Sequence, residues 1–199
     1  MVNRRFWLPI VLIIGLLPIW ADGAGRVFAT PPGRLPKVLH RVFVRALPLR
    51  GVETGPRHAP HLLIFFDPDC PFCAHLWQSF HPWRQDFRVR WVPVAYVRPS
   101  SLGRAAAILT SPHPGQALQQ NEGHFQYQKH LGGLMPLFAS SHSLQMAIHL
   151  NTQFWLQNLA MLPAIFYEKK IGTQLFLGSP SPRQWKRIAV SATHHWPGN

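Results

Sequence analysis

The sequence has only two cysteines, Cys70 and Cys73, and both lie in the stretch FFDPDCPFCAHLW. A structural zinc site commonly needs two pairs of cysteine or histidine ligands, and the chain offers no second pair with suitable spacing. Zinc or copper binding through Cys70, Cys73 and His75 is therefore the weaker alternative, and we expect no metal site. A disulfide between these cysteines would close so short a loop that it would restrain the unfolded chain very little. A reactive pair is the interpretation that fits best.

Acidic residues are scarce as well. Seven Asp and Glu face twenty Lys and Arg, so the formal net charge is +13. Such a balance favours acidic partners or anionic surfaces, but no nucleic-acid-binding motif is present, and we expect no nucleic-acid partner. With 47% hydrophobic and 14% charged residues, the chain can bury a core and is not typical of disordered proteins. Its 199 residues favour one domain with additions.

The chain lacks an apolar run long enough for an ordinary membrane span, which needs about 20 residues. Its longest run, Phe6–Trp20, has 15 residues, follows Arg4 and Arg5, and precedes the small residues ADGAG. This pattern predicts a signal peptide over residues 1–23, with an uncleaved membrane anchor as the open alternative. In either case the two cysteines would meet an oxidising compartment.

The remaining segments predict an α/β domain. Residues 24–59 are rich in Pro and Arg and are expected to form a linker or extension, in which VLHRVFVRALPL is a short helix or a strand. The apolar run HLLIFF predicts a buried strand at 61–66. Beyond it we expect a helix from Pro71, a strand within 87–97, helices near 101–110 and 116–122, a helix over 143–160, a hairpin formed by AIFYEKK and TQLFLG, and a last helix starting at Ser179 or Ser181.

Cys70 lies where the buried strand gives way to the next helix. The start of a helix presents unpaired N–H groups and a partial positive charge, which together stabilise a thiolate. We therefore expect Cys70 to be the exposed attacking thiolate and Cys73 the thiol beneath it that resolves the mixed disulfide. Asp67 and Asp69 would oppose the thiolate by their charge, and the simplest role for both is to form the turn and cap the helix.

Three segments together resemble the DsbC/DsbG group of periplasmic thiol–disulfide proteins. They are DPDCPFC, the stretch VAYVRPSSLGRAAAILTSPHPGQALQQ over residues 94–120, and LPAIFY over residues 162–167. The resemblance implies a thioredoxin-like fold over residues 60–199, with a helical insertion between its βαβ and ββα halves. It also implies an exported thiol–disulfide oxidoreductase or isomerase of the periplasm.

The same resemblance implies roles for particular residues. Cys70 would be the nucleophile, Cys73 the resolving thiol, and Pro163 the cis-proline that faces the CxxC. The backbone of Leu162 would pair with an extended substrate segment. With Leu162 and Pro163, Pro71 and Phe72 would contact substrate. No cofactor beyond a redox-active Cys70–Cys73 disulfide is implied.

Partners would be cysteine-containing exported proteins and a membrane or periplasmic redox partner. The position of Leu162 commonly holds Thr or Val in the family, so substrate preference or redox poise is expected to differ. Only about 40 residues separate the predicted cleavage site from the strand at His61. That is too few for the family's N-terminal dimerisation domain, which leaves a homodimer in doubt. The alternative function is a non-catalytic thioredoxin-like chaperone, or an assembly factor of an envelope secretion or conjugation system.

Overall fold

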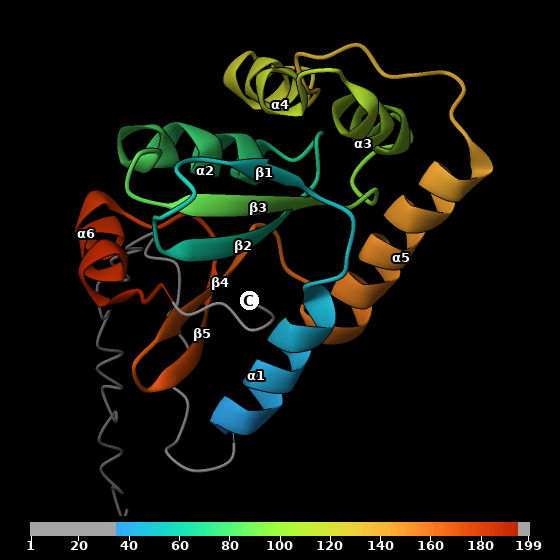
Figure 1. Cartoon of the computed structure of the whole chain (residues 1–199). Helices are drawn as coiled ribbons and strands as arrows, with labels where there is room; N and C mark the ends of the chain where they lie inside the picture. The colour runs from blue at the N-terminus through green and yellow to red at the C-terminus, as the bar shows by residue number, and fades with distance from the viewer. Residues whose placement is uncertain (1–34, 195–199) are drawn as a thin grey trace, which may run out of the picture.

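The computed structural model describes residues 35–194, which form a five-stranded sheet covered by helices on both faces (Figure 1). The strand order is β1-β3-β2-β4-β5. β2 and β3 run parallel, whereas the other neighbouring strands are antiparallel. The strands are β1 (Val52–Thr54), β2 (His61–Phe66), β3 (Arg88–Pro93), β4 (Ala164–Lys169) and β5 (Gly172–Leu177).

The apolar run HLLIFF became the central strand, β2, because both of its faces are covered. Every residue of β2 is buried. Alternate side chains of a strand point to opposite faces, so Leu62, Ile64 and Phe66 join one hydrophobic cluster. Leu63 and Phe65 join a second cluster on the other face. The sheet is therefore the middle layer of three.

Helices form the two outer layers. The cluster on one face contains side chains from α2 (Pro71–Phe80), α3 (Ser101–Thr110), α4 (Pro114–Gly123) and α6 (Pro182–Ser191). The cluster on the other face contains side chains from α1 (Leu35–Ala46) and the end of α5 (His142–Asn158). A short 3-10 helix, η1 (His81–Trp83), follows α2 and contains Pro82. This arrangement is the predicted α/β fold with a helical insertion, α3 to α5, between β3 and β4.

Most predicted elements are present. The hairpin of β4 and β5 turns between Lys169 and Gly172 as expected. Ser181 caps α6 through a capping box with Gln184. Ser100 precedes α3, but its hydroxyl makes no cap hydrogen bond and donates instead to Asp69.

The predicted extension, residues 24–59, contains two packed elements in its described part. VLHRVFVRALPL lies mainly in the helix α1, and β1 pairs with the edge of β3. Phe43 of α1 is fully buried and stacks on Phe166 of β4, with ring centroids 5.6 Å apart. The domain boundary at residue 60 stays a prediction. α1 contributes to one core cluster and β1 to the other.

The predicted signal peptide lies outside the described residues. Within residues 35–194, no helix is both long and apolar enough to cross a membrane.

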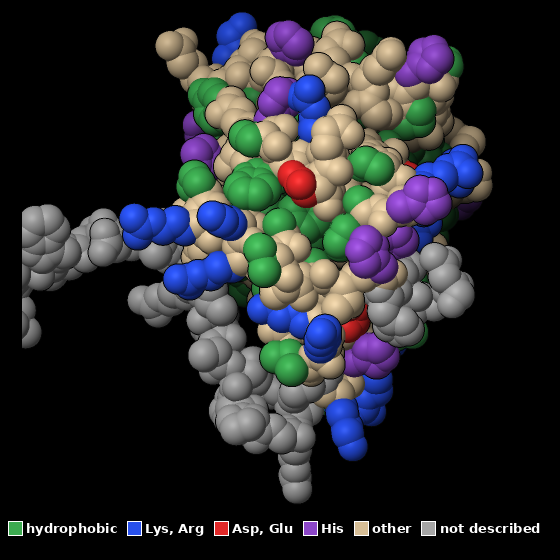
Figure 2. Space-filling model, turned by 60° about the vertical axis from the view of Figure 1, so that its left-hand side comes forward, with side chains coloured by type: hydrophobic (Ala, Val, Ile, Leu, Met, Phe, Trp, Pro, Cys, Tyr) green, Lys and Arg blue, Asp and Glu red, His purple; other side chains and the backbone are tan. Residues whose placement is uncertain are grey.

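Acidic side chains are concentrated inside the molecule. Of the seven acids in the sequence, four are buried, namely Asp67, Asp69, Glu122 and Glu168. Figure 2 shows one face of the molecule, on which Lys, Arg and His side chains are far more frequent than Asp and Glu. The surface is basic because most of the described acids are buried.

Candidate active site

Cys70 and Cys73 lie at the start of α2, directly after the loop that follows β2. Cys70 is the residue preceding the first helical turn, with extended backbone angles, and Pro71 is the first helical residue. The carbonyl of Cys70 accepts hydrogen bonds from the N–H groups of Cys73 and Ala74, at 3.0 and 3.1 Å. Pro71 suits this position because its missing N–H would have no partner in a first turn. Both cysteines are free thiols.

The prediction that Cys70 is exposed is wrong. Its side chain is 4% exposed and that of Cys73 is 1% exposed, and both belong to the core cluster that contains Phe66. The neighbouring Phe72, in contrast, is 70% exposed. The position of Cys70 before a helix predicted an exposed thiol, but Cys70 is buried within a core cluster.

The two thiols differ in acidity. A hydrogen bond from the Cys73 thiol, helped by the backbone N–H groups of Cys73 and Phe72, lowers the pKa of Cys70 against the opposing effects of burial and the Asp67 charge. Burial raises the pKa of Cys73 well above its ordinary value, and its bond to Cys70 and the charges of Cys70 and Glu122 add to the rise. Ionisation is therefore favoured at Cys70 and opposed at Cys73.

Asp67 ties together the loops that meet in front of α2. One carboxylate oxygen accepts from the Asp69 N–H (2.8 Å) and the Ser101 hydroxyl (2.7 Å). The other accepts from the N–H groups of Tyr96 and Val97, at 2.7 and 2.8 Å. Burial nevertheless raises the pKa of Asp67, and these hydrogen bonds only partly offset that effect. Asp67 forms the predicted turn, but α2 has no side-chain cap.

Asp69 is fully buried and pairs with Arg104 of α3, itself 5% exposed, at 3.1 Å. Its carboxylate also accepts from the Ser100 hydroxyl (2.6 Å) and the Gly132 N–H (2.8 Å). Arg104 donates in turn to the carbonyls of Gly132 and Leu134, at 3.2 and 2.9 Å. The loop before Cys70 is thereby fixed to the helical insertion.

Asn121 and Glu122, near the end of α4, lie in the same buried region. The Asn121 amide donates to the carbonyl of Pro68 (2.8 Å) and to one carboxylate oxygen of Glu122 (2.8 Å). Glu122 is 1% exposed, and its charge affects the pKa of Cys73. Sequence reasoning missed Asn121, Glu122 and Arg104, because their contacts with the cysteine loop join residues far apart in the chain.

The Leu162–Pro163 segment precedes β4 and lies at the same end of the sheet as the cysteine loop, which follows β2. The Leu162–Pro163 peptide bond is cis. Phe65 of β2 pairs with Ala164 of β4, so the residues before Ala164 lie beside the end of β2. Leu162 packs against both core clusters, one of which contains the two cysteines. Trp155 of α5 steadies this segment by donating to the carbonyl of Met161, at 2.9 Å.

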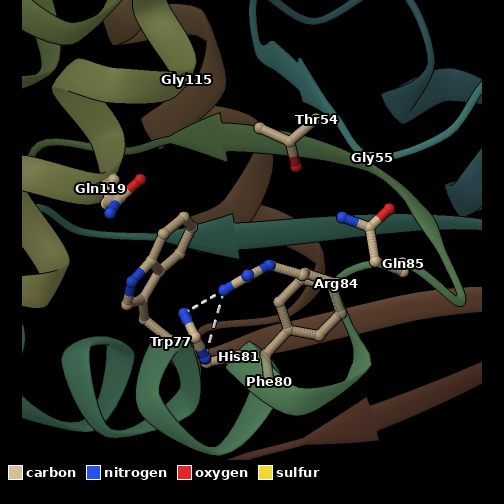
Figure 3. Close-up of a pocket in the computed structure, with 9 residues that line it drawn as sticks. All are labelled: Thr54, Gly55, Trp77, Phe80, His81, Arg84, Gln85, Gly115 and Gln119. Carbon is tan, nitrogen blue, oxygen red and sulfur yellow. Dashed lines mark hydrogen bonds between the residues drawn. The ribbon is translucent and has the colours of Figure 1, made fainter.

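A cavity of about 420 Å³ lies elsewhere, between β1, α4 and the end of α2 (Figure 3). Trp77 and Phe80 give it an apolar side, while Arg84 bonds to the His81 ring at its rim. Neither cysteine lines this cavity. We place the candidate active site at the thiols rather than there, because thiol–disulfide exchange needs the sulfur atoms themselves.

Zinc or copper binding through Cys70, Cys73 and His75 was the alternative to a reactive pair, and residues 35–194 contain no candidate ligand set. No group of three or more His, Cys, Asp or Glu side chains in that range is arranged to hold an ion. His75 is exposed, whereas both cysteines are buried.

Comparison with known proteins relates the chain to disulfide interchange proteins. No protein-family model matches it. The thiol:disulfide interchange protein DsbG of Escherichia coli K12 is 32% identical over 137 residues, which are 65% of this chain and 52% of that protein. DsbG of Pseudomonas aeruginosa is 31% identical over 142 residues, 69% of this chain and 54% of that protein. Over about two thirds of its length, the chain is similar to DsbG.

The chain spans about half the length of the curated relatives it matches. A crystal structure of a periplasmic thioredoxin-like protein from Salmonella enterica serovar Typhimurium superposes on it with a TM-score of 0.58. The superposition covers 77% of this chain and 94% of that chain, at 20% identity. The resemblance to DsbG and the thioredoxin-like fold are thus confirmed. The roles of Cys70, Cys73, Pro71, Phe72, Leu162 and Pro163 stay predictions.

Proposed function

We propose that the protein is an exported thiol–disulfide oxidoreductase or isomerase, with Cys70 as nucleophile and Cys73 as resolving thiol. The observation that carries the proposal is the opposed acidity of two adjacent free thiols at the start of α2. The pKa of Cys70 is lowered and that of Cys73 is raised. The more acidic thiol attacks first as a thiolate, and the less acidic thiol stays protonated until the second step. The two acidities therefore suit an ordered, two-step exchange.

The exchange balances without any added cofactor. The Cys70 thiolate attacks one sulfur of a substrate disulfide, forms a Cys70–substrate disulfide and expels the other substrate sulfur as a thiolate. Cys73 then loses its proton and attacks the Cys70 sulfur, and the second substrate thiolate leaves. The substrate gains two electrons and the protein is left with a Cys70–Cys73 disulfide. Run in reverse, the same steps oxidise a substrate dithiol.

Substrate would bind across the edge of the sheet where Leu162 and Pro163 meet the cysteine loop. Within the described residues, Leu162 makes no backbone hydrogen bond. Its N–H and carbonyl are therefore available to an extended peptide, as in strand addition. The exposed Phe72 ring and the half-buried Pro71 lie next to Cys70. They supply apolar contact for residues on either side of a substrate cysteine.

The substrates would be cysteine-containing exported proteins, and a membrane or periplasmic redox partner would reset the dithiol. The periplasm is the proposed location. The DsbG relatives are named for thiol:disulfide interchange, which supports this assignment. An export signal within residues 1–23, which lie outside the described part of the chain, would deliver the protein there.

Trapping with Cys73→Ala tests this function. Without Cys73 the mixed disulfide on Cys70 cannot be resolved, so substrates should accumulate as reductant-sensitive adducts on non-reducing gels. The matched control is the Cys70→Ala, Cys73→Ala double variant, which should trap nothing. Absence of adducts with the single variant would contradict the proposal. A double variant that kept full activity in cells would support instead the non-catalytic chaperone or assembly role.

A further inference from the structure

Glu122 is a buried acid whose carboxylate is only half satisfied. It lies in the last turn of α4 and is 1% exposed. One oxygen accepts from the Asn121 amide at 2.8 Å, while Oε2 has no hydrogen-bond partner among the described residues. A buried, unpaired carboxylate destabilises a fold by its desolvation. Because Glu122 lowers the stability of the fold, we expect a functional role that accounts for it.

The end of α4 is held directly against the cysteine loop and α2. The Asn121 amide donates to the carbonyl of Pro68, two residues before Cys70. A side-chain carbon placed on Gly123 would lie 3.8 Å from the Trp77 indole nitrogen of α2. Cys70 and Cys73 both interact electrostatically with Glu122. Glu122 thus lies near the dithiol, in the helical insertion.

We propose that Glu122 is the proton acceptor for Cys73 in the second step of the exchange, an inference that rests on the proposed function. As Cys73 attacks the Cys70 sulfur of the mixed disulfide, its thiol proton passes to the Glu122 carboxylate. The new Cys70–Cys73 bond forms, the bond from Cys70 to substrate breaks, and the electron pair leaves on the substrate sulfur. Glu122 then returns the proton to the departing thiolate or to water.

The charges around Glu122 favour its ionisation at the step in which Cys73 loses its proton. Burial raises its pKa well above the ordinary value, and the Cys70 thiolate raises it further. In the mixed disulfide Cys70 carries no charge, so the pKa of Glu122 falls and more of it is ionised when a base is needed. Arg104 is engaged with Asp69. The ionisable groups that interact electrostatically with Glu122 are Asp67, Asp69, Cys70, Cys73 and Tyr127. No cation in the described residues pairs with Glu122 itself.

Stopped-flow reaction with dithiobis-nitrobenzoate separates the two steps. The first release of thionitrobenzoate reports attack by Cys70, and the second reports attack by Cys73 on the mixed disulfide. Glu122→Gln should slow the second release about 100-fold near neutral pH, which is the typical loss for a general base. The first release should change little by comparison. The deficit should shrink with rising pH as Cys73 ionises unaided, and Glu122→Asp should restore part of the rate.

If Glu122 acted only through its charge, Glu122→Gln would change the rate of the second release in the opposite direction. The Glu122 charge raises the pKa of Cys73, so a residue acting only by repulsion would speed the second release when neutralised. An unchanged or faster second release in Glu122→Gln therefore overturns the inference. Glu168→Gln is the matched control, because Glu168 is also buried but lies on β4 beyond Tyr167, which pairs with the start of β2. This control should leave the second release unchanged.

Wild-type protein alone gives a further check that requires no variant to fold. Its second release should be slower in deuterium oxide, because the Cys73 proton is transferred to Glu122 during the attack. Equal rates in the two solvents would overturn the role of Glu122. Absence of any second release from wild-type protein would instead contradict the exchange itself, so the two failures are distinguishable.

Discussion

At the scale of single residues, Arg104 is the side chain on which the cysteine loop depends most. It is the cation that pairs with the fully buried Asp69, and it also holds the carbonyls of Gly132 and Leu134. Removing one partner of a buried pair leaves an uncompensated charge in a low-dielectric interior. The loop that carries Cys70 is therefore sensitive to a residue of another helix.

We predict that Arg104→Met lowers the free energy of unfolding by about 3–5 kcal/mol, the usual cost of a broken buried pair. Urea denaturation measures it. Arg98→Met is the matched control, because Arg98 is exposed and such a change typically costs no more than about 0.5 kcal/mol. Equal, small losses in both variants would contradict the structural role of Arg104.

Glu122 should also leave a signature in the pH dependence of stability. Its pKa in the folded protein is raised well above the ordinary value of 4.5, so the folded state binds more protons than the unfolded state above that pH. Wild-type stability therefore falls as pH rises from 4.5 toward the raised pKa. Glu122→Gln lacks this slope and should be more stable at neutral pH, by about 1 kcal/mol or more, because one unit of pKa corresponds to about 1.4 kcal/mol.

Urea denaturation of reduced wild-type protein and Glu122→Gln across this pH range measures the difference. The two curves should converge as pH falls below 4.5, where Glu122 is protonated in both the folded and the unfolded state. A variant that is less stable at neutral pH, with no convergence on acidification, would contradict the desolvated carboxyl.

At the scale of elements, α1 is the helix whose contribution the sequence left most open. Its segment was predicted as part of an extension before the domain, because Pro and Arg dominate its surroundings. In the structure Phe43 inserts under the sheet, and Ala46 is also fully buried. Together with the end of α5, α1 covers the face of the sheet opposite α2.

We predict that Phe43→Ala lowers the free energy of unfolding by about 3–5 kcal/mol, the range for deleting a buried aromatic ring. Val44 of the same helix is 39% exposed, so Val44→Ala is the control and should change stability by no more than about 0.5 kcal/mol. Guanidinium denaturation compares the two. Similar losses in both would mean that α1 does not cover the core.

Local patterns predicted the elements far better than the links between them. HLLIFF, Pro71 and the turn at Lys169–Gly172 act on their immediate neighbours, and each formed as predicted. The partners of Asp67 and Asp69 could not be read in this way. Ser101, Arg104 and Gly132 lie more than 30 residues along the chain, and only packing of the insertion brings them together. The same holds for Glu122.

At the scale of the whole molecule, charge is divided between surface and interior. The two described acids outside the core, Glu53 and Asp86, are exposed, while Asp67, Asp69 and Glu122 gather around the dithiol. Like charges there oppose ionisation of the cysteines, and the hydrogen bond from Cys73 outweighs them at Cys70. The fold therefore separates a basic exterior from an acidic interior around the dithiol.

One measurement tests the central claim, that Cys70 and Cys73 exchange disulfides as a pair. Purified protein is equilibrated in buffers with different ratios of reduced to oxidised glutathione. Its free thiols are then alkylated, and its mass is measured by mass spectrometry. We predict one two-electron transition from two free thiols to a Cys70–Cys73 disulfide, in which a tenfold change in the ratio of the two forms spans about 30 mV. Two thiols that stay free across the series, or separate one-thiol modifications without a protein disulfide, would contradict it.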